Sequence, residues 1–465
     1  MKKELSEEEK YIYMTETPVE KLIGTLAIPT IVSMLITSIY NMADTYFVGQ
    51  ISTTATGAVG ISFALMSIIQ ALGFMIGSGS GNYVSRLLGR RKIIDAEKVA
   101  STGLFSVLIL GFVLMTIGLV FLDSVVKVLG ATDTIFPYAK IYVRYILIGM
   151  PFMASALYLN ILLRFQGSSF YGMLGIGTGG LINILLDPIF IFKFSMGIGG
   201  AALATILSQF ISFLILLYFC GRHGNLPISW KKASPDKAMY MEIMRGGFPS
   251  FCRQGIASIS TAILNLSAAP YGDGVIAAMS IVNRIFHFAI AILLGFGQGF
   301  QPVCGFNYGA KRYDRVLNSY RFCVKVALAG LTVLSVIGFL GASNIVALFR
   351  RDDIEVITLG AKAIRLQCLV LPLSAWIIMD NMLLQMIRKT REASILAASK
   401  QGICFIPAIL ILPRIFGVLG IQISQPIADI ITLIIGIIVI KEPLRELELL
   451  KKAQSNIILN NEGHK

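Results

Sequence analysis

The sequence predicts an all-α membrane protein with twelve transmembrane helices in two pseudo-symmetric six-helix bundles. Three observations support this prediction: the composition, the recurrence of long apolar runs, and an internal repeat. Of the 465 residues, 55% are hydrophobic and only 14% are charged, and the mean hydropathy is +0.75. Soluble domains carry about 25% charged residues. The whole chain is therefore expected to lie in a bilayer.

Apolar runs long enough to cross a bilayer recur along the whole chain. A membrane-spanning helix needs about 20 apolar residues. The predicted spans cover residues 22–48, 55–84, 96–122, 137–163, 171–193, 197–220, 246–268, 276–304, 317–344, 359–386, 392–413 and 417–440. The polar N-terminal arm contains no hydrophobic core of a signal peptide.

The basic residues gather on one side of the predicted membrane. An even number of spans leaves both termini on that side, together with the basic segments RLLGRRK, SWKKASPDK, YGAKRYDR and RKTRE. Loops rich in lysine and arginine stay in the cytoplasm. Both termini are therefore expected to be cytoplasmic, with the chain in the cell membrane. The formal charge of +14 orients the protein and is no sign of a nucleic-acid partner.

The two halves of the chain repeat each other at an offset of 220–222 residues. ALGFMIG (71–77) matches LLGFGQG (293–299), and RYILIGMP (144–151) matches RLQCLVLP (365–372). Parallel repeats of this kind meet at a central cavity and rock to open it to each side in turn. A duplicated structural bundle or a channel is the alternative. The predicted regions are an N-lobe (1–220), a cytoplasmic linker (221–245), a C-lobe (246–440) and a cytoplasmic tail (441–465).

Two aspartates lie inside apolar spans of the first half. Asp44 is about 4 residues, and Asp187 about 6 residues, from the outer end of its span, or roughly 6 and 9 Å at the helical rise. Asn183 shares a helix face with Asp187, and Thr205 lies at a similar depth. Ionisable residues within spans are functional candidates. We expect these groups to form one polar layer in the outer half of the N-lobe.

Pro188 directly follows Asp187 and cannot donate a hydrogen bond to the carbonyl of Ile184. A freed carbonyl, two carboxylates, an amide oxygen and a hydroxyl suit a proton or a small cation such as Na⁺. Small residues in the same span let it approach the first span closely: Gly172, Gly175, Gly177, Gly179 and Gly180. A structural aspartate that caps local backbone is the alternative interpretation. The repeat favours function, because Cys404 and Ala408 occupy the positions that match Asn183 and Asp187.

The second half has its own ionisable residues. Asp380 and Lys400 lie at similar depth on adjacent antiparallel spans, which predicts an ion pair. Asp429 is near the middle of the last span, and Arg284 and His287 share one helix face. These residues are candidates for lining a substrate cavity or for coupling. For Asp429, cavity lining and a structural role are equally favoured. For His287, hydrogen-bonded packing is the alternative to carrying a proton.

The chain resembles the multidrug and toxic compound extrusion (MATE) family over essentially its whole length. The motifs that carry the resemblance are YNMADTYFVGQ (40–50), SRLLGRRK (85–92), LINILLDPIFIF (181–192), GIGGAALAT (197–205) and GFNYGAKRYDRV (305–316). The resemblance implies secondary antiport, in which cationic or amphipathic drugs leave the cell in exchange for H⁺ or Na⁺.

The resemblance also implies which residues bind the coupling ion. Family members with a cation site in the first lobe build it from positions that match Asp44, Asn183, Asp187, the Ala201 carbonyl and Thr205. The branch with a site in the second lobe uses a glutamate in span 7. Here span 7 contains no glutamate and has an arginine, Arg253, instead. We therefore expect coupling in the N-lobe.

Two rival functions stay open at this stage. A flippase for lipid-linked saccharides needs a cationic cavity, for which Arg144, Arg253, Arg284 and Arg365 are available. A membrane enzyme is disfavoured because no HExxH motif or paired-histidine site appears. The expected protein is a monomeric carrier of small organic cations. It has no cofactor other than its coupling ion, and no metal other than a Na⁺ at Asp44 and Asp187. Neither the choice between H⁺ and Na⁺ nor the drug spectrum follows from the sequence.

Overall fold

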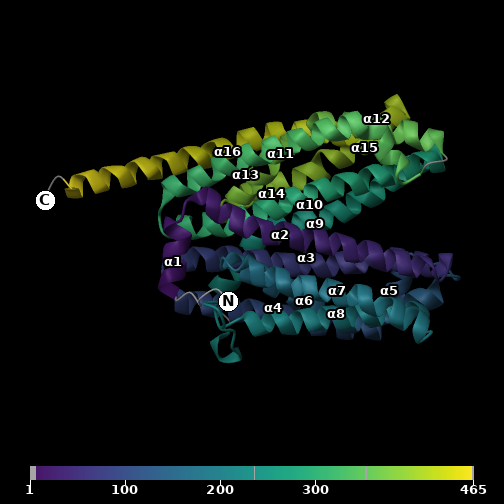
Figure 1. Ribbon diagram of the computed structural model, residues 1–465, viewed down its shortest axis with the longest axis horizontal. Coiled ribbons are helices and arrows are strands. Elements are labelled where there is room, and N and C mark those ends of the chain that lie inside the picture. Colours follow the sequence, from purple (N-terminus) through teal and green to yellow (C-terminus); the bar gives the residue numbers. More distant parts are fainter. Residues whose placement is uncertain (1–6, 235, 351–352, 463–465) are drawn as a thin grey trace.

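The computed structural model describes residues 7–234, 236–350 and 353–462, and within these ranges the chain forms helices, turns and loops but no strands. Two helical bundles lie one above the other (Figure 1). The N-terminal half, in purple and teal, forms one bundle, and the C-terminal half, in green and yellow, forms the other. The predicted all-α fold with two bundles is confirmed.

The N-lobe contains six spanning segments and two short helices. The spanning segments begin and end near the predicted positions, and the short helix α5 (Leu122–Val128) follows the third of them. The Ser52 hydroxyl caps α3 by accepting a hydrogen bond from the Ala55 N–H at 3.0 Å. The other helices are α1 (Glu7–Glu16), α2 (Val19–Gly49), α3 (Thr53–Gly89), α4 (Ile93–Val120), α6 (Phe136–Phe165), α7 (Ser169–Pro188) with its π-helical extension η1 (Ile189–Lys193), and α8 (Gly197–Phe219).

The C-lobe follows a connecting segment that contains the short turn η2 (Trp230–Lys232). Its helices are α9 (Lys237–Ala268), η3 (Ala269–Tyr271), α10 (Asp273–Gly309), α11 (Tyr313–Ala347), α12 (Ile354–Val370), η4 (Leu371–Leu373), α13 (Ser374–Met386), α14 (Thr390–Ala398), η5 (Ser399–Ile403), α15 (Phe405–Phe416) and α16 (Val418–Glu462). Helix α16 continues past residue 440, so the tail predicted to begin at 441 prolongs the last spanning helix. Residues 463–465 of the predicted tail lie outside the described residues.

Eleven segments of the described chain are long and apolar enough to cross a membrane. The remaining predicted span, residues 246–268, lies in α9, which has 32 residues but is less apolar. Arg253, Gln254 and Asn265 lie within this span, and such polar side chains lower its mean hydropathy. Helix α9 packs along α3 of the other lobe, so its polar residues face protein as well as lipid.

Two spans of the C-lobe that the sequence predicts as continuous helices are interrupted. Residues 359–386 divide into α12 and α13 at the 3₁₀ turn η4, which contains Pro372. Proline lacks the N–H that an α-helix needs at this point. Residues 392–413 divide into α14 and α15 at the π-helical turn η5, which contains Lys400. Irregular turns of this kind leave backbone groups available to side chains.

The internal repeat extends to individual hydrogen bonds. The Asn160 amide donates to the Gly172 carbonyl at 2.9 Å, and Asn381, its partner at an offset of 221 residues, donates to the Ala393 carbonyl at 2.6 Å. The same side chain thus ties two consecutive helices together in each lobe. The duplication seen in the sequence is therefore a duplication of structure.

The lobes pack most closely at the end that carries α1, which we call the inner end because the sequence predicts it to be cytoplasmic. A Cβ atom on Gly79 of α3 would lie 1.9 Å from the Ile243 carbonyl oxygen of α9, so only glycine fits. The repeat-related contact brings Gly299 of α10 against Ala27 of α2. Two pseudo-symmetric backbone contacts therefore close the inner end.

An ion-pair network reinforces this closure. The Glu242 carboxylate on α9 accepts from Arg86 of α3 and from Arg388 after α13, each at 2.9 Å. Helix α1 stands across both bundles at this end (Figure 1). Lys10 of α1 bonds to Ser168 of the N-lobe, and the carbonyl of Met14 accepts from Asn307 of the C-lobe. The inner end thus holds the two lobes together.

The hydrophobic cores follow the division of the chain into two lobes. One core is formed by residues of the N-lobe, together with Leu226 of the connecting segment and Ile243 at the start of α9. A second contains C-lobe residues such as Leu264 and Ile421. A third core is shared, because Leu22 and Phe165 of the N-lobe pack with Phe300 and Leu384 of the C-lobe. The lobes therefore join in a common core, while each also has a core of its own.

Candidate functional site

The five residues predicted to bind a cation come together in the N-lobe. Asp44 lies near the end of α2, Asn183 and Asp187 lie on α7, and Ala201 and Thr205 lie on α8. All five are buried, with exposed fractions of 9% for Asp44 and 0% for Asp187. Helices α2, α7 and α8 pack against one another, so the three elements deliver these side chains to one place.

Hydrogen bonds connect most of the cluster. The Asn183 amide donates to Asp187 Oδ1 at 3.3 Å and approaches the Thr205 hydroxyl at 3.5 Å. The Thr205 hydroxyl donates to the Ala201 carbonyl at 3.1 Å. The carboxylates of Asp44 and Asp187 are near enough to interact electrostatically. Only weak or distant donors thus face two buried acids.

Several oxygens of the cluster lack any hydrogen-bond partner among the described residues. They are Asp44 Oδ1, Asn183 Oδ1 and Asp187 Oδ2, all of which are acceptors. A buried acceptor without a donor costs about 1–3 kcal/mol, and more if it is charged. Protons on the carboxylates or a cation among these oxygens would remove that cost. The arrangement therefore fits H⁺ or a small monovalent cation with oxygen ligands.

Tyr142 of α6 belongs to this cluster, although sequence reasoning did not identify it. Its side chain is fully buried beside Asp44, Asp187 and Thr205, and its hydroxyl forms no close hydrogen bond among the described residues, although the Thr205 side chain is near enough to interact with it. A tyrosine in an apolar span usually indicates packing. The repeat contains the missing signal, because Ala363 occupies the equivalent position in the second half.

Glycines on α7 make the approach to α2 possible. A Cβ atom on Gly180 would lie 3.0 Å from side-chain atoms of both Ile36 and Tyr40 on α2, and one on Gly177 would lie 3.3 Å from Ile36. Larger residues would push the helices apart and separate Asp187 from Asp44. The predicted thin face of this span is therefore confirmed at these two positions, while the role of the Ile184 carbonyl stays a prediction.

The acids of the C-lobe have different surroundings. Asp429 accepts hydrogen bonds from Gln367 at 3.0 Å and from Gln425 at 2.9 Å, and Lys400 lies 3.8 Å from its carboxylate. Asp380 instead accepts from the hydroxyl of Tyr320. The predicted pairing of Asp380 with Lys400 is wrong. Lys400 lies in the π-helical turn η5, and its ammonium group reaches Asp429 of α16 and not Asp380.

Lys400 also connects the two interrupted spans. Its ammonium group donates to the Ser374 hydroxyl at 2.8 Å, and Ser374 directly follows the turn η4. The candidate residues Arg284 and His287 are exposed on α10, outside both acid clusters. The structure thus leaves Asp380 and Asp429 buried with partners of their own, and it does not bring Arg284 or His287 to them.

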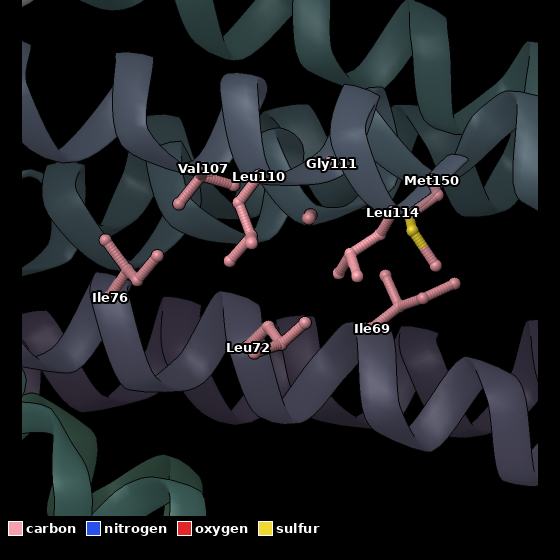
Figure 2. Close-up of a pocket in the computed structure, with 9 residues that line it drawn as sticks. Ile69, Leu72, Ile76, Val107, Leu110, Gly111, Leu114 and Met150 are labelled. Carbon is pink, nitrogen blue, oxygen red and sulfur yellow. The ribbon is translucent and has the colours of Figure 1, made fainter. Parts of the chain in front are cut away.

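A separate apolar pocket lies inside the N-lobe, between α3, α4 and α6 (Figure 2). Its walls are entirely hydrophobic, and include Ile69, Leu114 and Met150. It offers no group that could orient a charged ligand. Among the described residues, no group of three or more His, Cys, Asp and Glu side chains could hold a metal ion.

Comparisons with known proteins agree with the fold and the repeat. The MatE family model matches residues 29–189 and 249–410, once in each half. The multidrug export protein MepA of Staphylococcus haemolyticus is 27% identical over 435 residues, which cover 93% of this chain and 96% of the relative. MepA of Staphylococcus aureus is 27% identical over 428 residues, covering 91% and 93%.

Solved structures of transporters are similar along most of their length. A multidrug resistance MATE transporter of the MOP superfamily in an outward-facing conformation has a TM-score of 0.87 and 26% identity, covering 95% of this chain and 98% of that one. A MOP superfamily transporter from Pyrococcus furiosus, described as having a binding pocket of reversed polarity, gives the same values. Together with the family match, these likenesses establish that the chain is a multi-pass transporter of the MATE family and not an enzyme.

Proposed function

We propose that the protein is a secondary antiporter that exports cationic or amphipathic organic compounds in exchange for H⁺ or Na⁺. The observation that carries the proposal is the set of unpartnered, buried oxygens on Asp44, Asn183 and Asp187. The names of the relatives, which are multidrug export proteins, support drugs as substrates. The protein would act in the cell membrane as a monomer, with both termini in the cytoplasm.

Coupling would follow from the position of the acid pair between three helices. An ion that enters from outside neutralises Asp44 and Asp187 and lets α2 and α7 pack more tightly. This packing disfavours bound drug and favours its release. An ion can drive transport only if it binds the two states with different affinities. A carboxylate pair that is accessible from one side at a time would supply that difference.

Opening toward the cytoplasm requires the inner end to separate. The Glu242 bridge to Arg86 and Arg388 would have to break, and the contact between Gly79 and Ile243 would have to part. The free energy gained when the ion leaves and the drug binds would offset the loss of these contacts. Alternating access then amounts to exchange between a closed and an open inner end.

Transport in proteoliposomes tests the proposal. The purified full-length protein is reconstituted, a cationic amphipathic dye is supplied, and Na⁺ and pH gradients are imposed one at a time. We expect one of the two gradients to drive dye against its concentration difference, while the other has little effect. Dye movement that follows only its own gradient in every condition would contradict antiport.

A matched variant makes the test specific to the site. Asp123→Asn changes an exposed acid that pairs with Lys140 at the outer end, and should transport dye as the wild type does. Asp44→Asn should abolish ion-driven transport. Equal coupling in the wild type and Asp44→Asn would remove the N-lobe site from the proposal.

A further inference from the structure

Two arginines, one from each lobe, are near enough to interact electrostatically. Arg164 is at the end of α6, and Arg253 is within α9. Arg164 is only 4% exposed, and one of its terminal nitrogens donates to the Gln298 side chain of α10 at 2.6 Å. Its Nε has no hydrogen-bond partner among the described residues. A nearly buried guanidinium group therefore has a neutral amide as its one polar side-chain contact.

No acid accompanies these two positive charges in the described part of the chain. The charges of Arg164 and Arg253 interact, and within the described part of the chain neither side chain forms an ion pair. Arg86, which is equally buried, shows the usual solution, because Glu242 pairs with it at 2.9 Å. Buried charges are normally paired, and two like charges in one place make the need for a counter-ion stronger.

The internal repeat argues against a purely architectural role. Gln385 stands at the position equivalent to Arg164, and Ser33 stands at the position equivalent to Arg253. Both replacements are neutral, whereas architectural features such as the Asn160 and Asn381 hydrogen bonds recur in both halves. The arginine pair is thus as asymmetric as the acid cluster. It also lies on other helices than the acids of that cluster, since Arg164 and Arg253 belong to α6 and α9.

We propose that Arg164 and Arg253 form a binding site for an oxyanion, which is a carboxylate or phosphate group of the transported compound. A guanidinium group presents a planar fork of N–H donors that matches these groups in a bidentate manner. This inference rests on the proposed function and adds amphiphiles that carry an anionic oxygen group, including zwitterions, to the compounds that the protein would export. Because the two arginines belong to different lobes, the bound oxyanion would bridge them.

Binding of a matched pair of compounds tests the site. An amphipathic fluorophore is used as its free carboxylic acid and as its methyl ester, with the full-length protein in phosphatidylcholine vesicles. Charge-assisted hydrogen bonds contribute more than neutral ones. We expect the wild type to bind the acid at least about tenfold more tightly than the ester. Arg253→Gln should bring the two affinities close together, and Arg253→Lys should keep part of the preference.

Two further variants separate a binding role from a structural one. Arg164→Gln should also remove the preference for the acid over the ester. If this substitution prevents folding because Arg164 is deeply buried, Arg253→Gln still tests the site. Arg144→Gln changes an exposed arginine on the same helix as Arg164 and should keep the wild-type ratio. Equal loss of acid and ester affinity in Arg253→Gln would assign Arg253 to structure and overturn the proposal.

A lipid phosphate could supply the same chemistry, and a second arm identifies that source. The melting temperature of the wild type and of Arg253→Gln is measured in micelles with phosphatidylcholine or with phosphatidylglycerol. Stabilisation by phosphatidylglycerol that depends on Arg253 assigns the oxyanion to a lipid, and an acid preference without it assigns the oxyanion to the transported compound. The absence of both effects contradicts the site.

Both measurements are made without an ion gradient. Failure of antiport would leave the acid preference in place. Failure of the oxyanion site would leave gradient-driven transport of a cationic dye by the wild type intact. The two proposals can therefore fail separately.

Discussion

Each lobe buries two aspartates, but the hydrogen-bond and ion-pair partners of these aspartates differ between the lobes. In the C-lobe, Asp429 has two glutamine donors and the ammonium group of Lys400, and Asp380 has the hydroxyl of Tyr320. In the N-lobe, Asp44 and Asp187 each keep one oxygen without a partner, and no lysine or arginine pairs with either within the described chain. The fold is duplicated, while the electrostatics are not.

This difference indicates which lobe needs an external cation. A buried acid is tolerated when a partner charge and hydrogen bonds accompany it. Lys400 is a cation that the C-lobe carries permanently, so Asp429 has little to gain from a dissolved ion. The N-lobe carries no such group at Asp187. We therefore propose that its acid pair exchanges ions with the solution, as a coupling site requires.

Loss of the N-lobe acids should have the largest effect on transport. We expect Asp187→Asn to reduce gradient-driven dye transport by more than about tenfold, because a single acid cannot replace the pair. The melting temperature should stay the same or rise, since an unpaired buried charge is removed. Transport in proteoliposomes and a thermal melt on the same preparation check both parts. A large fall in melting temperature would indicate a structural acid instead.

Loss of the C-lobe acid should show the reverse pattern. Asp429→Asn leaves the partly buried Lys400 without a counter-charge and should destabilise the fold by about 1–3 kcal/mol. Ion dependence should be retained in the protein that still folds. Lys400→Met combined with Asp429→Leu should recover most of the loss, because an apolar pair can replace a buried ion pair. Thermal unfolding of the single and double variants measures this. A double variant that is no more stable than Asp429→Asn would refute the pairing.

Tyr142 sharpens the contrast within the N-lobe. Removing its hydroxyl in Tyr142→Phe should weaken the coupling ion's apparent affinity by about three- to tenfold, the effect of one hydrogen bond or ligand. Tyr158→Phe is the matched control, because the Tyr158 hydroxyl donates to the Ala100 carbonyl at 2.8 Å in the same lobe. The control should lose stability and keep ion affinity. Titration of transport against ion concentration separates the two.

The smallest effect is expected at Pro188. Pro188→Ala restores an N–H that can donate to the Ile184 carbonyl, which would then be less available to an ion. We expect ion affinity to fall by about twofold, with transport still coupled. The same ion titration measures it. Unchanged affinity would mean that the Ile184 carbonyl is no ligand.

The sequence predicts the lobes, the spans and the N-lobe cluster because each leaves a local pattern. Apolar runs mark the spans, and an acid in an apolar run such as Asp187 is conspicuous by itself. Tyr142 was not predicted because a tyrosine in an apolar span is as consistent with packing as with ion binding. Only its contacts in the structure place it beside the acids. The partner of Lys400 was mispredicted because helix depth was counted along regular helices, whereas the π-helical turn η5 interrupts the helix at Lys400. Arg164 was missed because it lies at a span end, where arginines are common.

The most direct test of the central claim is the stabilisation of the protein by its coupling ion. An ion that binds only the folded state at a hundred times its dissociation constant stabilises it by about 2.7 kcal/mol. Melting temperatures are measured against increasing concentration of the ion that drives transport, for the wild type, Asp380→Asn, and the double variant with Asp44→Asn and Asp187→Asn. The account predicts a rise in the wild type and Asp380→Asn, and none in the double variant. A rise that survives in the double variant and disappears in Asp380→Asn would place coupling in the C-lobe and contradict it.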